Sequence, residues 1–219
     1  MGDIKTYDAY LFDWDGTIAS SHGFILEFVR GQLRSLGIEL TDQQIVDKLF
    51  GRYGLGMAEL GVSKEDIARL GSEVHEHLKE NMPLAKLYPQ VRTALETLHA
   101  RHHKMALVTA TYREVIDAAI VSHGLIGLFD CIVTGDEMIA QKPDPGGLLK
   151  ALDMLGVPPE RAVMIGDSKK DILAGNSAAT ETILFHPPEH GSQHDINDLK
   201  RCNPTYTIGS WQEFLDRLQ

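Results

Sequence analysis

Short apolar runs recur along the chain, separated by longer segments of mixed polarity. Runs of this kind are typical of strands that are buried on both faces of a sheet. We predict such strands at residues 9–12, 104–110, 131–134, 162–165 and 182–185, with a sixth candidate at 205–208. Amphipathic segments lie between the later runs, and strand–helix–strand repetition predicts a parallel sheet with right-handed crossovers. The expected fold class is α/β.

The segments between the strand candidates predict helices. Apolar side chains repeat at helical spacing near residues 91–98, 115–120 and 148–155. Before the last of these, Asp144 precedes Pro145, a pair that predicts an N-cap residue followed by proline at the first helical position.

One long segment contains no strand candidate. Residues 19–85 carry three helical stripes instead, centred on residues 25–36, 41–49 and 67–78. This segment leaves the carboxyl end of the first strand, which is where ligands bind in open α/β sheets. We therefore predict a core domain formed by residues 1–18 and 86–219, and a helical cap domain, placed as a lid, formed by residues 19–85.

Charge and composition exclude several classes of function. The 219 residues carry a formal net charge of −10, which disfavours a surface for nucleic-acid phosphates. No apolar run approaches the roughly 18 residues of a membrane span, and residues 1–5 lack the pattern of a signal peptide, so we expect a cytoplasmic protein. Cys131 and Cys202 have no metal-binding spacing, and Cys131 is expected to be a small buried hydrophobe.

Two carboxylates follow the first strand, in the motif DWDGT at 13–17. Asp13 and Asp15 are one residue apart, and two neighbouring carboxylates repel each other unless a cation neutralises them. Hard oxygen ligands suit Mg²⁺. The alternative is an acidic strand-to-loop turn in which Gly16 supplies flexibility.

Polar residues also follow three later strands. Thr109, with the backbone N–H groups around Ala110, offers an anion-binding nest, or else only caps a helix. Lys142 lies between the third and fourth strands and could neutralise an anion, although most lysines in loops are solvated. Asp167 and Asp171 follow the fourth strand one helical turn apart, and capping alone does not explain a second acidic pair. Together, these are the groups that an enzyme needs for magnesium-dependent phosphoryl transfer to a carboxylate.

The order of these motifs resembles the haloacid dehalogenase-like (HAD) superfamily: DWDGT at 13–17, Thr109 after LV, Lys142 in KPDP, and GDSKKD at 166–171. The resemblance covers about residues 7–185. It is strongest to the branch of phosphoglycolate phosphatase and β-phosphoglucomutase, in which a helical cap is inserted after the first motif. It implies a doubly wound, Rossmann-like parallel sheet with a small α-helical cap domain.

The resemblance also implies a role for each motif residue. Asp13 is the expected nucleophile, which forms an aspartyl-phosphate. Asp15 is expected to protonate the leaving oxygen as an acid and then to activate the hydrolytic water as a base. Thr109, Ala110 and Lys142 are expected to hold the phosphoryl oxygens.

For the metal, the resemblance implies Mg²⁺ bound by Asp13, the carbonyl oxygen of Asp15 and Asp167, with Asp171 assisting directly or through water. An acid at position 15 is absent from dehalogenases of this family, because a halide needs no protonation. Asp15 therefore favours a phosphate ester as substrate.

We predict a Mg²⁺-dependent phosphatase acting on a small phosphorylated metabolite, with no nucleic-acid or membrane partner, as a monomer or homodimer. A phosphomutase of the β-phosphoglucomutase type is the nearest alternative, since it uses the same residues. A signalling receiver domain is a distant one, because receiver domains are about half this length and lack a helical insertion.

Two further patterns, a histidine series and a glycine-rich segment, each allow two interpretations. His186, His190 and His194 are four residues apart, but Pro187 and Pro188 exclude a continuous helix, so we predict a solvated loop rather than a metal site. The glycine-rich segment 51–56 predicts a break between cap helices. Arg52 in it is a candidate substrate contact, or else a surface arginine on a mobile connector.

Overall fold

The computed structural model describes residues 2–192 and 195–219. Its main sheet contains β1 (Ala9–Phe12), β4 (Lys104–Val108), β5 (Cys131–Val133), β6 (Ala162–Gly166), β7 (Glu181–Phe185) and β8 (Tyr206–Ile208). The six strands are parallel and lie in the order β5-β4-β1-β6-β7-β8. All six predicted strands are present, and the predicted α/β fold is confirmed.

The strand order contains one reversal, beside β1. The chain passes from β1 to β4 and β5 on one side, returns to β6 on the other side of β1, and continues to β7 and β8. In open α/β sheets, ligands bind at the carboxyl ends of the strands beside such a reversal. The ends of β1, β4 and β6 are therefore where the site is expected.

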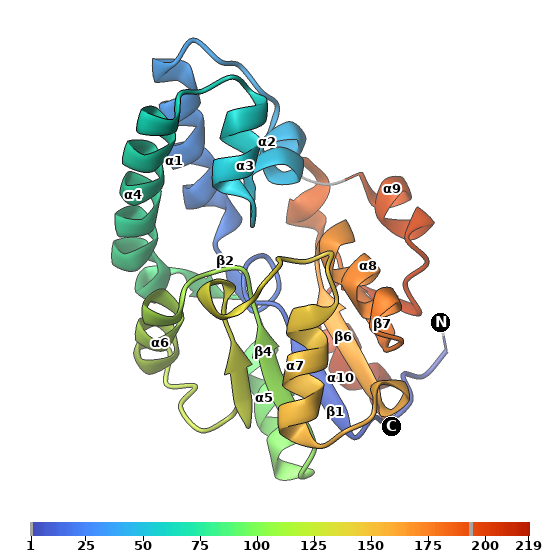
Figure 1. The fold of residues 1–219 in the computed structure, drawn as a ribbon. Helices are drawn as coiled ribbons and strands as arrows, with labels where there is room; N and C mark the ends of the chain where they lie inside the picture. Colours follow the sequence, from blue (N-terminus) through green and yellow to red (C-terminus); the bar gives the residue numbers. More distant parts are fainter. Residues whose placement is uncertain (1, 193–194) are drawn as a thin grey trace.

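Helices cover both faces of the sheet, as predicted for a doubly wound fold (Figure 1). Tyr10 and Phe12 of β1 pack in one hydrophobic cluster with α5 (Val91–Ala100), α6 (Arg113–Ser122) and α10 (Trp211–Arg217). Ala9 and Leu11 face the other side and pack with α7 (Gly146–Leu155) and α8 (Lys169–Ser177). The alternation follows from the two-residue period of a strand. Helix α9 (Ile196–Arg201) packs against β7 and α8 near the sheet edge.

Four helices lie between β1 and α5. They are α1 (His22–Ser35), α2 (Asp42–Leu49), α3 (Tyr53–Glu59) and α4 (Lys64–Asn81), and Figure 1 shows them grouped above the sheet, beyond the ends of β1, β4 and β6. Where the chain enters and leaves this group, β2 (Ala19–Ser20) and β3 (Lys86–Leu87) pair antiparallel. The three predicted stripes correspond to α1, α2 and α4.

Helix α3 corrects the prediction of a glycine-rich break at 51–56. The helix begins at Tyr53 and includes Gly56. A Cβ atom at Gly56 would lie 2.1 Å from the carbonyl oxygen of Lys48, so glycine permits α3 to pack closely against α2. The low helix propensity of glycine suggested a break, and packing between the two helices outweighs that propensity.

The start of α7 also differs from the prediction, by one residue. The helix begins at Gly146, so Pro145 precedes the first helical residue. Oδ1 of Asp144 accepts a hydrogen bond from the Gly146 N–H at 2.8 Å. The Asp144 side chain therefore does stabilise the helix start, but Pro145 occupies the capping position itself.

Two expectations from composition concern Cys131 and membrane-spanning helices. Cys131 is buried in the cluster with α7, and burial raises the pKa of its thiol to about 11, as expected for a small hydrophobe without reactivity. Within residues 2–192 and 195–219, no helix combines the length and apolar character needed to cross a bilayer.

Candidate active site

Asp13 and Lys142 form the centre of the candidate site. Asp13 directly follows β1, and Lys142 lies in the loop between β5 and α7. Nζ of Lys142 lies 2.7 Å from Oδ1 of Asp13, 2.5 Å from Oδ1 of Asp171 and 3.0 Å from the Val108 carbonyl oxygen. Lys142 is only 8 % exposed, so the alternative of a solvated loop lysine is wrong.

The charge of Lys142 is maintained by its two carboxylate partners. Burial alone would lower the pKa of Lys142, but the carboxylates of Asp13 and Asp171 outweigh burial and raise this pKa above its usual value. The side chain is therefore a fixed positive charge at the end of β1.

Three buried carboxylates gather beside this lysine. One oxygen from each of Asp13, Asp167 and Asp171 lies within 4.8 Å of the others. Burial and the neighbouring carboxylates raise the pKa of Asp13 well above its usual range, and Lys142 opposes this shift only in part. A further cation in the cluster would favour the ionised form of Asp13, so the donor set fits a hard divalent ion.

Asp171 also stabilises the start of α8. Its Oδ2 accepts hydrogen bonds from the N–H of Ser168 at 3.1 Å and from the Ser168 hydroxyl at 2.6 Å. The bond from the N–H is one half of a capping box, in which the Ser168 side chain accepts in turn from the backbone N–H of Asp171. A Cβ atom at Gly166 would lie 2.3 Å from Cγ of Asp171, so glycine at this position allows the close approach. Asp171 therefore both caps α8 and belongs to the carboxylate cluster.

Two hydroxyl groups hold Asp15. Ser21 donates to its Oδ1 at 2.5 Å, and Thr111 donates to its Oδ2 at 2.7 Å. Ser21 immediately precedes α1, whereas Thr111 follows β4. The carboxylate is therefore fixed from both the helical segment and the sheet. Sequence reasoning did not identify Ser21, and it assigned no role to the Thr111 hydroxyl, which lies just beyond the predicted nest at Thr109 and Ala110.

Thr109 and Ala110 continue directly from β4. Thr109 is fully buried, and its Oγ1 accepts a hydrogen bond from the Thr111 N–H at 3.2 Å. Because Val108 accepts a hydrogen bond from Lys142, the end of β4 is held beside Asp13. The structure therefore brings the Thr109 turn to the carboxylate cluster.

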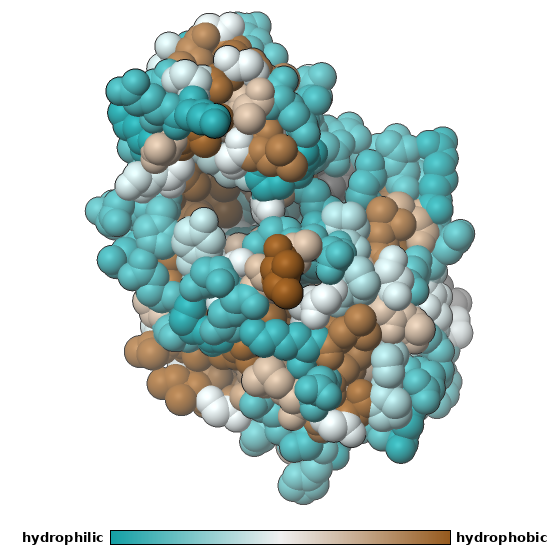
Figure 2. Space-filling view, in the orientation of Figure 1, coloured by the Kyte–Doolittle hydropathy of each residue, from teal (hydrophilic) through white to brown (hydrophobic). Residues whose placement is uncertain are grey.

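A cavity of about 560 Å³ separates this cluster from the helices above the sheet. In Figure 2 the surface is hollowed between the upper and lower parts of the molecule. Carboxylates and Lys142 line one side of the cavity, and the helices contribute an apolar wall. The apolar lining residues include Ile25, Val29, Val46, Leu49, Phe50, Ile67, Val74 and Leu78.

Comparison with known proteins identifies the family of the chain. Residues 10–185 match the family described as haloacid dehalogenase-like hydrolase. The chain belongs to this family. The expected enzyme class, a haloacid dehalogenase-like phosphatase, is thereby confirmed.

Individual relatives share most of their length with this haloacid dehalogenase-like hydrolase. The phosphoglycolate phosphatase of Aquifex aeolicus is 35 % identical over 176 residues, which cover 80 % of this chain and 82 % of the relative. The pyrophosphatase PpaX of Halalkalibacterium halodurans is 29 % identical, with 94 % of each chain covered. The structure of β-phosphoglucomutase from Clostridium difficile has a TM-score of 0.77 at 19 % identity, covering 97 % of this chain and 100 % of that one.

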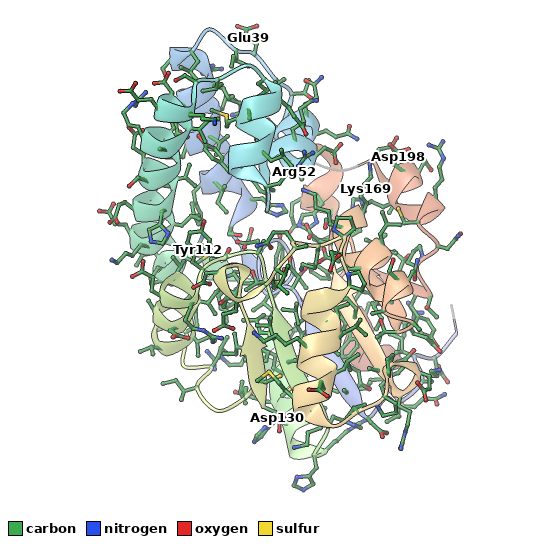
Figure 3. The ribbon with its side chains drawn as sticks, in the orientation of Figure 1. Glu39, Arg52, Tyr112, Asp130, Lys169 and Asp198 are labelled. Atoms are coloured by element: carbon green, nitrogen blue, oxygen red, sulfur yellow. The ribbon has the colours of Figure 1, made fainter. Side chains whose placement is uncertain are left out.

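Arg52 lines the cavity of this hydrolase just before α3, where its guanidinium forms an ion pair with Glu59. Figure 3 shows Arg52 at the lower end of the helical group, with Lys169 on the sheet side of the same opening. The next residue, Lys170, donates to the carbonyl oxygens of Val46 and Phe50 at 3.2 and 2.6 Å. A cation at these carbonyls stabilises the carboxyl end of α2 and joins it to α8.

His190 corrects the prediction of a solvated histidine loop. It is buried, and its Nε2 lies 2.6 Å from the Tyr88 hydroxyl oxygen. The rings of Tyr88 and Phe185 pack against it. The two prolines do exclude a continuous helix here, but they do not decide burial, which depends on residues distant in the sequence. His186 is half-buried, and His194 lies outside the described residues.

Proposed function

We propose that this chain is a Mg²⁺-dependent phosphatase that hydrolyses a small phosphomonoester through an aspartyl-phosphate at Asp13. The observation that carries the proposal is the position of Asp13 at the end of β1. There its carboxylate contacts Lys142 at 2.7 Å and lies within 4.8 Å of Asp167 and Asp171. The family and its phosphatase relatives support this chemistry.

The residues that would hold Mg²⁺ are Asp13, Asp167 and the backbone carbonyl of Asp15, with Asp171 assisting directly or through water. All these donors are oxygens, as Mg²⁺ requires. When bound, the ion would reduce the repulsion between an anionic nucleophile and an anionic phosphate. The raised pKa of Asp13 supports the need for a cation beyond Lys142.

Asp13 then takes part in the bond changes at phosphorus, and Asp15 carries out the proton transfers. A carboxylate oxygen of Asp13 forms a bond to phosphorus as the bond to the leaving oxygen breaks, and Asp15 donates a proton to that oxygen. In the second half, Asp15 takes a proton from water, and the water oxygen attacks phosphorus. Inorganic phosphate leaves, and the Asp13 carboxylate is restored.

Thr109, the backbone N–H of Ala110 and Lys142 are suited to hold the phosphoryl oxygens. The Lys142 ammonium stays charged, and a hydrogen bond from the Thr111 N–H to Oγ1 of Thr109 stabilises the Thr109 turn. Groups fixed in advance stabilise developing charge without reorganising during the reaction.

We further propose that residues 19–85 act as a cap domain over a core formed by residues 1–18 and 86–219. The cap contributes the apolar wall of the cavity, and Ser21 at its base contacts Asp15. Closure of such a cap would exclude water during phosphoryl transfer, and its opening would release product. A cavity of about 560 Å³ leaves room for the organic half of a phosphorylated metabolite. Cytoplasmic location and the choice between monomer and homodimer stay predictions.

Removal of the metal should abolish the activity. Without a cation, the carboxylate cluster repels phosphate, so we expect phosphate release to fall at least about 100-fold in excess EDTA and to recover with added Mg²⁺. The measurement is phosphate release across a panel of small phosphoesters. The same samples, analysed for isomerised sugar phosphates, distinguish a mutase. Undiminished phosphate release in excess EDTA would contradict the magnesium role.

Arg52→Ala should raise KM for the preferred ester about tenfold, while turnover of a generic aryl phosphate changes little, because the reacting groups are untouched. Arg69→Ala, which removes an exposed arginine from α4, is the matched control. Glu59→Gln removes the ion-pair partner but keeps the guanidinium. Equal losses on both substrates, or the same loss in Glu59→Gln, would indicate a structural role for Arg52.

A further inference from the structure

A second group of potential metal ligands lies beside the carboxylate cluster. His22, Asp167 and His190 are all buried, and one ligand atom from each lies within 4.8 Å of the other two. Nδ1 of His22 is 3.7 Å, and Nδ1 of His190 is 3.8 Å, from Oδ2 of Asp167. The mechanism proposed above uses neither histidine.

Three separate segments bring this group together. His22 is the first residue of α1, Asp167 follows β6, and His190 lies in the short helical turn at 188–192 after β7. A Cβ atom at Gly16 would lie 2.3 Å from Oδ2 of Asp167 and 2.5 Å from Cε1 of His22. The backbone of the DWDGT motif therefore passes directly against the group, and glycine makes that approach possible.

We propose that His22, His190 and Asp167 form a binding site for Zn²⁺ that shares Asp167, but neither histidine, with the proposed Mg²⁺ site. Two imidazoles and one carboxylate are a ligand set that zinc prefers and magnesium does not. Tetrahedral bonds of about 2.0–2.1 Å place ligand atoms roughly 3.3 Å apart. The spacings of 3.7 and 3.8 Å reach this value with side-chain shifts of a few tenths of an ångström.

Tyr88 is placed to orient one of the ligands. Its hydroxyl oxygen, 2.6 Å from Nε2 of His190, can accept the proton that a neutral imidazole carries there. Nδ1, which faces Asp167, then presents its lone pair to the metal. A second hydrogen bond of this kind fixes the tautomer and the ring orientation of metal-binding histidines.

The shared Asp167 connects the two sites. Zn²⁺ bound by the histidines engages the carboxylate that the acidic cluster also needs, so Zn²⁺ should inhibit the enzyme by raising the Mg²⁺ concentration required for half-maximal activity. This consequence rests on the proposed function, whereas Zn²⁺ binding itself does not.

Binding is tested with Zn²⁺ alone, in competition with a chromophoric chelator, on the full chain in excess Mg²⁺. We expect one Zn²⁺ per chain in the wild type, and at least tenfold weaker binding in His22→Gln and in His190→Gln. His99→Gln, at an exposed position of α5, is the matched control and should bind as the wild type does. X-ray absorption of the zinc-loaded wild type should show two imidazole ligands, a readout that needs no variant to fold.

Unchanged affinity in His190→Gln, or a zinc spectrum without imidazole, would overturn the site. So would tight binding that is lost in Asp171→Asn but kept in both histidine variants, because it would place the ion in the acidic cluster. In the activity arm, Zn²⁺ should raise the half-maximal Mg²⁺ concentration for the wild type but not for His190→Gln. Failure of this arm alone counts against the shared role of Asp167, and absence of any Mg²⁺-dependent activity counts against the proposed function.

Discussion

Asp13→Asn should lose phosphate release by a factor of at least about 10⁴, which corresponds to about 5.5 kcal/mol of transition-state stabilisation. The amide is a poor nucleophile, so no phosphoenzyme can form, and no other carboxylate at the end of β1 occupies the same position. The measurement is kcat/KM with an activated aryl phosphate, for which leaving-group protonation is not limiting. Activity within tenfold of the wild type would exclude Asp13 as the nucleophile.

The fold of Asp13→Asn should survive, which makes its loss of activity interpretable. The pKa of Asp13 is raised in the folded protein by burial and by neighbouring carboxylates. A raised carboxyl pKa means that ionisation costs stability above the unfolded pKa, and the neutral amide avoids this cost. We expect the metal-free variant to unfold at or above the temperature of the metal-free wild type. Asp153→Asn, at an exposed position of α7, should retain full activity.

Asp15→Asn should lower turnover about 10²- to 10⁴-fold, the usual contribution of general acid–base catalysis. The variant keeps the nucleophile and the backbone carbonyl of residue 15. It loses the acid for an alkoxide leaving group and the base for the hydrolytic water. The deficit should be larger for alkyl esters than for aryl esters in the first step, whereas the second step should be slow for both. Rapid-mixing measurements of both half-reactions, with the two ester types, separate these effects.

The variants Ser21→Ala and Thr111→Val provide a graded comparison for Asp15→Asn. Each removes one hydroxyl that orients the Asp15 carboxylate, at 2.5 and 2.7 Å respectively, and leaves the carboxylate itself. Their losses should be smaller than that of Asp15→Asn and should affect the same half-reactions. Losses confined to substrate binding would show that these hydroxyls do not act through Asp15.

The sheet and the ends of its strands were predictable because the signals are local. Residues such as Tyr10–Phe12 are apolar without interruption because helices cover both faces of the sheet. Asp13, Thr109, Lys142 and Asp167 each follow a strand or lie in the loop beyond one, and parallel strands bring such positions together. Their meeting at one edge therefore follows from the fold class.

The features that sequence reasoning missed depend on packing between different elements of the fold. His190 follows two prolines and resembles a loop residue. Tyr88, which is 102 positions away in the sequence, forms a hydrogen bond with it and supplies part of its apolar environment. Helix α3 contains glycines that lower its intrinsic propensity, and the close packing of Gly56 against Lys48 explains why glycine occupies position 56. Neither contact has a local sequence signal.

The central claim is that Asp13 carries the phosphoryl group, and intact mass spectrometry of Asp15→Asn tests it most directly. The variant, mixed with Mg²⁺ and an aryl phosphate and then quenched in acid, should gain the mass of one phosphoryl group. Peptide mapping should place that group on Asp13, and Asp13→Asn in the same background should show no gain. A phosphoryl group on any other residue, or fast turnover by Asp15→Asn with no adduct in the steady state, would contradict the account.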